Sequence, residues 1–169
     1  MGEVQQGVNG APATAAGMDG ASPAGPGLES PMLDALAQLE VGQVVAERDI
    51  AFTRDSLVRY AGASGDFNPI HYRDDVAAAV GLPGVLAHGM LTMGAAVQPV
   101  VDWAGPARIR DYQVRFTRPV VVDPAAGAVM HVVAKVGHLG EGTARIDLTV
   151  SFDERTVLGK AQVVVATDR

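Results

Sequence analysis

The second half of the chain alternates between apolar and polar residues with the period of a β-strand. From Thr143 to Phe152, five polar residues alternate with five apolar residues. Because successive side chains of a strand point to opposite faces, this run predicts a strand with one buried face. A shorter alternation over Tyr112–Phe116, and apolar runs over Ala128–Val136 and Thr156–Ala166, predict three further strands.

Helical patterns dominate the first half. The segment from Leu86 to about Trp103 is apolar over its length and predicts a long helix. Its small residues would allow a sheet to approach the helix backbone closely; they are Gly89, Gly94, Ala95 and Ala96.

Shorter elements precede this helix. Glu47–Phe52 predicts a strand, and Thr53 is a good N-cap for a helix over residues 54–61. An irregular loop should follow, because Gly62, Gly65 and the Asn68-Pro69 pair all break helices. Asp74 to Val80 predicts a short helix.

The order of elements predicts an α+β fold in which an antiparallel sheet of about five strands wraps around the long helix. The connectors 123–127, 138–142 and 153–155 are short enough to join antiparallel neighbours. Residues 1–30 are rich in Gly, Ala and Pro and predict a disordered tail, which leaves 31–169 as one domain. The sheet edges need covering, which favours a dimer with a continuous sheet.

Composition narrows the classes of function. The net charge of −6 argues against nucleic-acid binding, and the lack of cysteine excludes thiolate chemistry and disulfides. No basic residue precedes Arg48, so no secretory or mitochondrial leader is expected. His88, Gln98 and Asp102 interrupt the apolar run that would be long enough to span a membrane. We therefore expect a soluble, cytoplasmic protein with neither a membrane nor a nucleic-acid partner.

The candidate chemistry lies between Ser64 and Met90. Asp66 and His71 stand five positions apart in the irregular loop, and Gly89 lies at the start of the long helix. An acid/base pair facing a glycine amide is what proton transfer next to a thioester carbonyl requires. Each residue alone has a structural interpretation: a turn cap, a loop histidine or a packing glycine. No metal is expected, since His131 and His138 have no second ligand near them in the sequence.

The motifs taken together resemble a known family. Tyr60-Ala61-Gly62 with Ser64-Gly65-Asp66-Phe67-Asn68-Pro69-Ile70-His71, and then Ala87-His88-Gly89-Met90, are similar to the hydratase signature of MaoC-like dehydratases with the hot-dog fold. The nearest likeness is to the catalytic-type subunit of actinobacterial 3-hydroxyacyl-thioester dehydratases. The similarity runs through Val114-Arg115-Phe116-Thr117 and Pro119 and covers residues 41–166.

The resemblance implies a catalytic dyad of Asp66 and His71, with the Gly89 amide binding the thioester oxygen. It also implies an enoyl or (3R)-3-hydroxyacyl substrate on coenzyme A or acyl carrier protein, and hydration without a metal or organic cofactor. We expect Ser64 to hold the loop in shape, and Asn68 either to do the same or to help position water. His88 would be either a structural residue or a substrate contact, and Met90 either core or substrate lining.

Two alternatives stay open. Thioesterases share the hot-dog fold, although many place a carboxylate in the long helix, where this chain has none from Leu86 to Val101. The chain could also be an acyl-binding subunit of a heterodimeric dehydratase. The predicted function is a dehydratase/hydratase, as a homodimer or paired with a related subunit.

Overall fold

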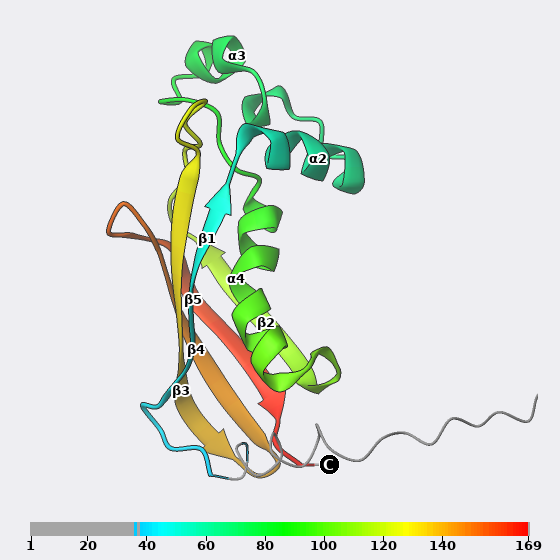
Figure 1. Ribbon diagram of the computed structural model, residues 1–169, viewed down its shortest axis with the longest axis vertical. Coiled ribbons are helices and arrows are strands. Elements are labelled where there is room, and N and C mark those ends of the chain that lie inside the picture. Colours follow the sequence, from blue (N-terminus) through cyan, green and yellow to red (C-terminus); the bar gives the residue numbers. More distant parts are fainter. Residues whose placement is uncertain (1–35, 37, 169) are drawn as a thin grey trace, which may run out of the picture.

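A five-stranded antiparallel sheet curls around one long helix (Figure 1). The computed structural model describes residue 36 and residues 38–168. The prediction of an α+β fold with a sheet around a central helix is confirmed. In chain order the elements are β1 (Val44–Phe52), α2 (Arg54–Ser64), η1 (Pro69–His71), α3 (Asp74–Ala79), α4 (Gly89–Ala104), η2 (Pro106–Arg108), β2 (Ile109–Phe116), β3 (Ala128–Gly140), β4 (Thr143–Phe152) and β5 (Arg155–Ala166).

The sheet has the strand order β1-β3-β4-β5-β2. The prediction that residues 123–127 join neighbouring strands is wrong, because β2 pairs with β5 at the edge and not with β3. Asp123 and Gly127 instead close a local turn through two mutual backbone hydrogen bonds of 3.0 Å. The other two connectors do join antiparallel neighbours, and β3 extends to Gly140, so its link to β4 is shorter than predicted.

The core lies between the concave face of the sheet and α4. The alternation predicted for β4 is confirmed, since Ala144, Ile146, Leu148 and Val150 are all buried. The face of α4 that packs on the sheet consists of Thr92, Ala96, Pro99, Val100 and Ala104. Gly94 is exposed, and nothing lies within 4 Å of where its Cβ would be. The sheet therefore does not approach the helix at Gly94, contrary to expectation.

Two predicted helix boundaries are wrong. The long helix begins at Gly89 and not at Leu86, because the preceding residues pair with another extended segment: Leu86 forms a bridge with Val121, and the Ala87 amide donates to Val120 O. Gly62 does not end α2. That helix starts at the predicted cap, where Thr53 and Ser56 form a reciprocal capping box, and it ends at Gly65 with a φ of 75°.

Figure 1 shows α2 and α3 gathered at one end of the sheet, near the start of α4. This arrangement brings the loop after α2 close to the first turn of the long helix. The predicted tail over residues 1–30 lies outside the described residues and stays a prediction. Among the described helices, none is long and apolar enough to cross a membrane.

Candidate active site

The loop after α2 is shaped by its own side chains. Ser64 Oγ donates to Tyr60 O (2.7 Å) and accepts the Asp66 amide (3.2 Å). The Asp66 carboxylate accepts the Asn68 amide at 3.2 Å, and Asn68 Oδ1 in turn accepts the amide of Ile70 at 3.3 Å. Short polar side chains that bond to backbone two residues away are what stabilises such turns. Ser64 and Asn68 thus make backbone contacts on either side of Asp66.

His71 ends this loop in a fixed orientation. Its side chain is almost buried, and Nδ1 donates to Leu86 O at 2.7 Å, while the Leu86 amide donates to Ile70 O at 3.2 Å. Since a carbonyl only accepts, Nδ1 carries a proton, and the lone pair of the uncharged form of the ring is then on Nε2. That nitrogen lies 4.0 Å from Oδ2 of Asp66, whose side chain is half exposed.

His88 joins the loop to the helix. It is the N-cap residue of α4 and 1% exposed, its Nε2 donates to Asp66 O at 3.1 Å, and its ring stacks on His71 with centroids 3.8 Å apart. Tyr60 contacts the same ring edge-on at 4.8 Å. Burial, followed by the nearby imidazole of His71, holds the pKa of His88 below its usual value. Nδ1 of His88 is buried without a hydrogen-bond partner among the described residues.

The sequence did not indicate this stacked pair. His71 and His88 lie on separate segments, and only the pairing of residues 85–87 with residues 120–122 and with the loop brings them together. The one available signal was position: a histidine immediately before a helix-opening glycine, in an apolar run.

Gly89 and His71 line one cleft of about 340 Å³. Gly89 is the first residue of α4, and the first amides of a helix have no partner within it. The Phe116 ring covers this turn: a Cβ on Gly89 would lie 3.3 Å from Phe116 Cε1. The remaining lining residues are Leu86, Ala87, Thr92, Phe116, Thr117, Arg118, Pro119 and Val120. Met90 is 59% exposed and is not among them.

The Asp66 carboxylate, the His71 imidazole and the first amide of α4 therefore lie together at one end of the sheet. A family profile described as "MaoC like domain" matches residues 37–151, more than half of the sequence. The chain belongs to the MaoC-like domain family. Its architecture is accordingly the hot-dog fold.

Individual relatives support the same assignment. 3-Hydroxyacyl-thioester dehydratase X of Mycobacterium tuberculosis is 37% identical over 101 residues, which are 60% of this chain and 32% of that protein. A solved MaoC-like dehydratase is 34% identical with a TM-score of 0.75, over 78% of this chain and 41% of that one. R-hydratase PhaJ1 from Pseudomonas aeruginosa is 29% identical with a TM-score of 0.67, over 79% and 86%. This MaoC-like chain thus spans about a third of the curated relative's length.

Asp66, His71 and His88 also form a cluster of groups that can bind metals. Ligand atoms of Asp66, His71 and His88 lie within 4.8 Å of one another. Imidazole nitrogens bind a metal in the plane of the ring at about 2.0–2.1 Å. The two rings here are stacked, with an angle of 24° between their planes, so their in-plane lone pairs do not converge on one point. The geometry does not favour an ion, and the absence of a metal from the MaoC-like chain stays a prediction.

Proposed function

We propose that the chain is a hydro-lyase that reversibly hydrates trans-2-enoyl thioesters to (3R)-3-hydroxyacyl thioesters carried on coenzyme A or acyl carrier protein. One observation carries the proposal: His71 Nε2 and Asp66 Oδ2 are 4.0 Å apart beside the cleft that contains the first amide of α4. The relatives named as dehydratases and R-hydratases support it.

The distance between the two groups suits a shared water. At 4.0 Å they are too far apart for a direct hydrogen bond, but one water oxygen can bond to both. In the proposed reaction the dyad takes a proton from this water as its oxygen bonds to C3, and a proton is delivered to C2. Positioned acid/base groups of this kind contribute about 10²–10⁴-fold.

Negative charge grows on the thioester oxygen as the C3–O bond forms. The Gly89 amide is the proposed donor, because it lies at the positive end of the helix dipole of α4. A glycine at this position leaves room for the carbonyl under the Phe116 ring.

The neighbouring residues are proposed to position the dyad. His88 holds the Asp66 carbonyl and the His71 ring, and Ser64 and Asn68 hold the backbone on either side of Asp66. With 1% exposure, His88 has little surface to offer a substrate, so we assign it a positioning role.

The assembly is proposed to be a dimer, formed with a second copy or a related subunit. Met90 and Phe116 are 59% and 51% exposed beside the cleft, which is unfavourable for large apolar side chains in water. A solved hot-dog relative is a complex of two chains, ChsH1 and ChsH2.

The proposal is tested by mixing the protein with a short trans-2-enoyl-coenzyme A and following the enoyl absorbance, with a thiol reagent present. We expect absorbance loss without thiol release, reduced about 10²–10⁴-fold in Asp66→Asn and His71→Gln. A His138→Gln variant, which changes an exposed histidine, should retain full activity. Thiol release would instead identify a hydrolase, and activity retained in both dyad variants would contradict the assigned residues.

A further inference from the structure

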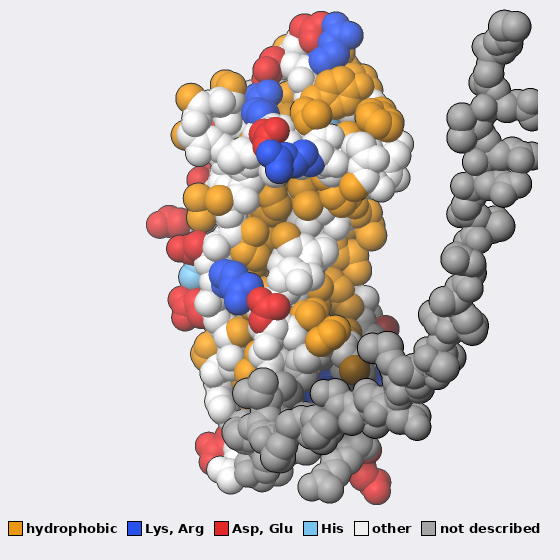
Figure 2. All heavy atoms as spheres, turned by 45° about the vertical axis from the view of Figure 1, so that its right-hand side comes forward, with side chains coloured by type: hydrophobic (Ala, Val, Ile, Leu, Met, Phe, Trp, Pro, Cys, Tyr) orange, Lys and Arg blue, Asp and Glu red, His pale blue; other side chains and the backbone are white. Residues whose placement is uncertain are grey.

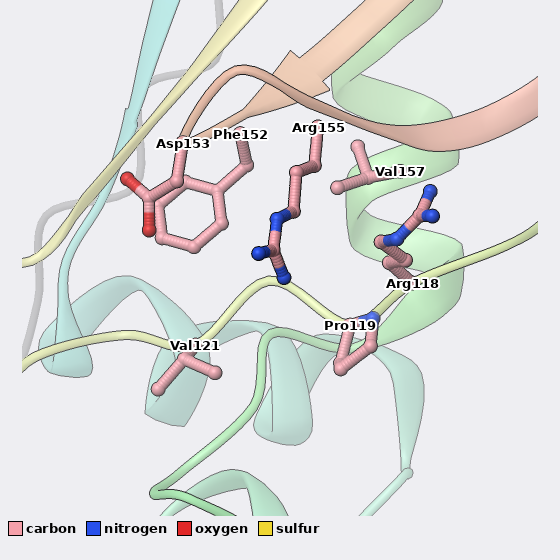
Figure 3. A pocket seen from close by; sticks show the side chains of 7 residues that line it. All are labelled: Arg118, Pro119, Val121, Phe152, Asp153, Arg155 and Val157. Atoms are coloured by element: carbon pink, nitrogen blue, oxygen red, sulfur yellow. The ribbon is translucent and has the colours of Figure 1, made fainter.

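A second pocket, of about 490 Å³, adjoins the candidate active site (Figure 3). Arg118 and Pro119 line both spaces, so the cleft and the pocket are neighbours along the segment after β2. The other walls are mostly apolar, and the lining residues are Arg118, Pro119, Val121, Phe152, Asp153, Arg155 and Val157. A ligand whose reactive end lies beside Gly89 can therefore extend past Arg118 into this pocket.

The two arginines of the pocket form no ion pair with a carboxylate of the described residues. Among the described arginines, Arg48, Arg54, Arg59, Arg73 and Arg145 form ion pairs, whereas Arg108, Arg110 and Arg115 form none with a described residue. Neither Arg118 nor Arg155 forms one with any described residue, including Asp153 in the same pocket. In a chain with six more acidic than basic residues, two such cations in one pocket favour an anionic ligand.

The fold places both residues at the pocket, although only the Arg118 side chain is held by a hydrogen bond. Arg118 Nη1 donates to Thr156 O at 3.0 Å, which ties it to β5. Arg155 follows the tight turn between β4 and β5, where Asp153 and Glu154 have φ values of 47° and 59°. Positive φ at both central residues defines a two-residue hairpin that usually uses Asn-Gly. Figure 3 shows Arg155 reaching from this turn toward the segment that carries Pro119 and Val121.

Uncommon backbone at a turn is often retained at functional sites. Here it fixes Arg155 opposite Phe152 in the strand register, so that both side chains line the pocket. The result is a cation beside apolar walls, a combination that fits an uncharged arm ending in a phosphate.

We propose that the Arg118/Arg155 pocket binds the phosphate at the end of the pantetheine arm of the thioester substrate. The inference rests on the proposed function, because it extends the same substrate from the Gly89 cleft. The phosphate in question is common to coenzyme A and to the prosthetic group of a carrier protein, so the chemistry does not depend on which carrier is used.

Binding is measured first, without turnover. Coenzyme A is titrated calorimetrically into the wild-type protein, Arg155→Ala, the Arg118→Ala/Arg155→Ala double variant and Arg59→Ala. Arg59 is a matched control, an exposed arginine on α2 paired only with Asp55. We expect the Kd to rise about tenfold or more in the first two variants, as loss of a charge-assisted bond predicts, and to be unchanged in Arg59→Ala. No binding to the wild-type protein, or one Kd for all four proteins, would overturn the proposal.

Kinetic measurements then distinguish the proposed phosphate site from the proposed hydratase function. Enoyl thioesters of coenzyme A, phosphopantetheine and pantetheine are compared. The arginine variants should raise KM for the first two substrates and leave the pantetheine thioester unchanged. An effect confined to the coenzyme A thioester overturns the assignment to the shared phosphate. If binding depends on the arginines but no thioester is hydrated, the proposed function is wrong and the proposed anion site is still supported.

The set of variants includes one that should not disturb the fold. The Arg155 side chain makes no hydrogen bond with a described residue, so Arg155→Ala tests the pocket without removing the Arg118 bond to Thr156.

Discussion

At the scale of single residues, the stacked pair of His71 and His88 has a consequence for stability. Protonating both rings would place two positive charges within a centroid distance of 3.8 Å in a buried setting. Burial and this neighbour lower the pKa of His88 in the folded protein, whereas in the unfolded chain a histidine has a pKa of about 6.5. Near and below that pH an unfolded His88 binds more protons than the folded one, so the contribution of His88 to the free energy of unfolding falls as the pH falls.

We therefore expect chemical denaturation to give a lower free energy of unfolding at pH 5 than at pH 7 in the wild-type protein. His88→Phe keeps an aromatic ring against His71 but cannot titrate, so its pH slope should be smaller. His138→Gln removes an exposed histidine and should keep the wild-type slope. Equal slopes in His88→Phe and the wild type would contradict the role of the buried ring.

How much of the site could be predicted from the sequence depended on how local each contact is. Asp66 and His71 belong to one loop, and the turn signals around Asn68-Pro69 indicated that loop correctly. The stacking of His88 was not predicted, because it depends on the pairing of residues 85–87 with Val120 to Val122. No periodicity within either segment carries that information.

At the scale of elements, the Phe116 ring leaves little room at the first turn of α4, where the proposed oxyanion donor lies. A Cβ on Gly89 would meet Phe116 at 3.3 Å, closer than most side-chain contacts, at the amide proposed to hold the thioester oxygen. Alanine itself is favourable in a helix, so we expect the fold to persist while access to the amide is lost. Gly89→Ala should lower kcat/KM by about 10²-fold or more, the size of losing one oxyanion donor.

Gly94→Ala provides the matched control on the same helix. Nothing lies within 4 Å of the added Cβ, so activity should be retained and stability should rise by about 1 kcal/mol. Steady-state kinetics and thermal unfolding of both variants are the measurements. Full activity in Gly89→Ala would remove the proposed oxyanion role.

Sequence patterns predicted which segments are helices and strands better than they predicted which strands lie next to each other in the sheet. The alternation of β4 and the cap at Thr53 are local, and both were predicted. The position of β2 at the far edge was not, because a short link containing Asp123 and Gly127 resembles a hairpin turn. The backbone of Val120 and Val122 pairs instead with residues 85–87, and no pattern within the connector indicates that pairing.

At the scale of the whole molecule, the sheet covers only one side of α4. Figure 2 shows hydrophobic side chains gathered over the α4 side of the molecule. Leu91, Ala95, Val97 and Trp103 are only partly buried there. The edge of β2 that faces away from β5 also pairs with no other described strand. An uncovered apolar helix face beside a free strand edge favours association, since both are unfavourable in water.

We therefore expect light scattering to give a mass of twice 17.4 kDa at assay concentrations. Met90→Glu puts a charge on the exposed first turn of α4 and should shift the protein toward monomer with loss of activity. Val80→Glu adds the same charge at a position of similar exposure, 62% against 59%, after α3, and should do neither. A monomeric wild-type protein that becomes active only with a second, related chain would favour the heterodimer over the homodimer. A fully active monomer would contradict both the homodimer and the heterodimer, because the apolar face of α4 would then need no partner to cover it.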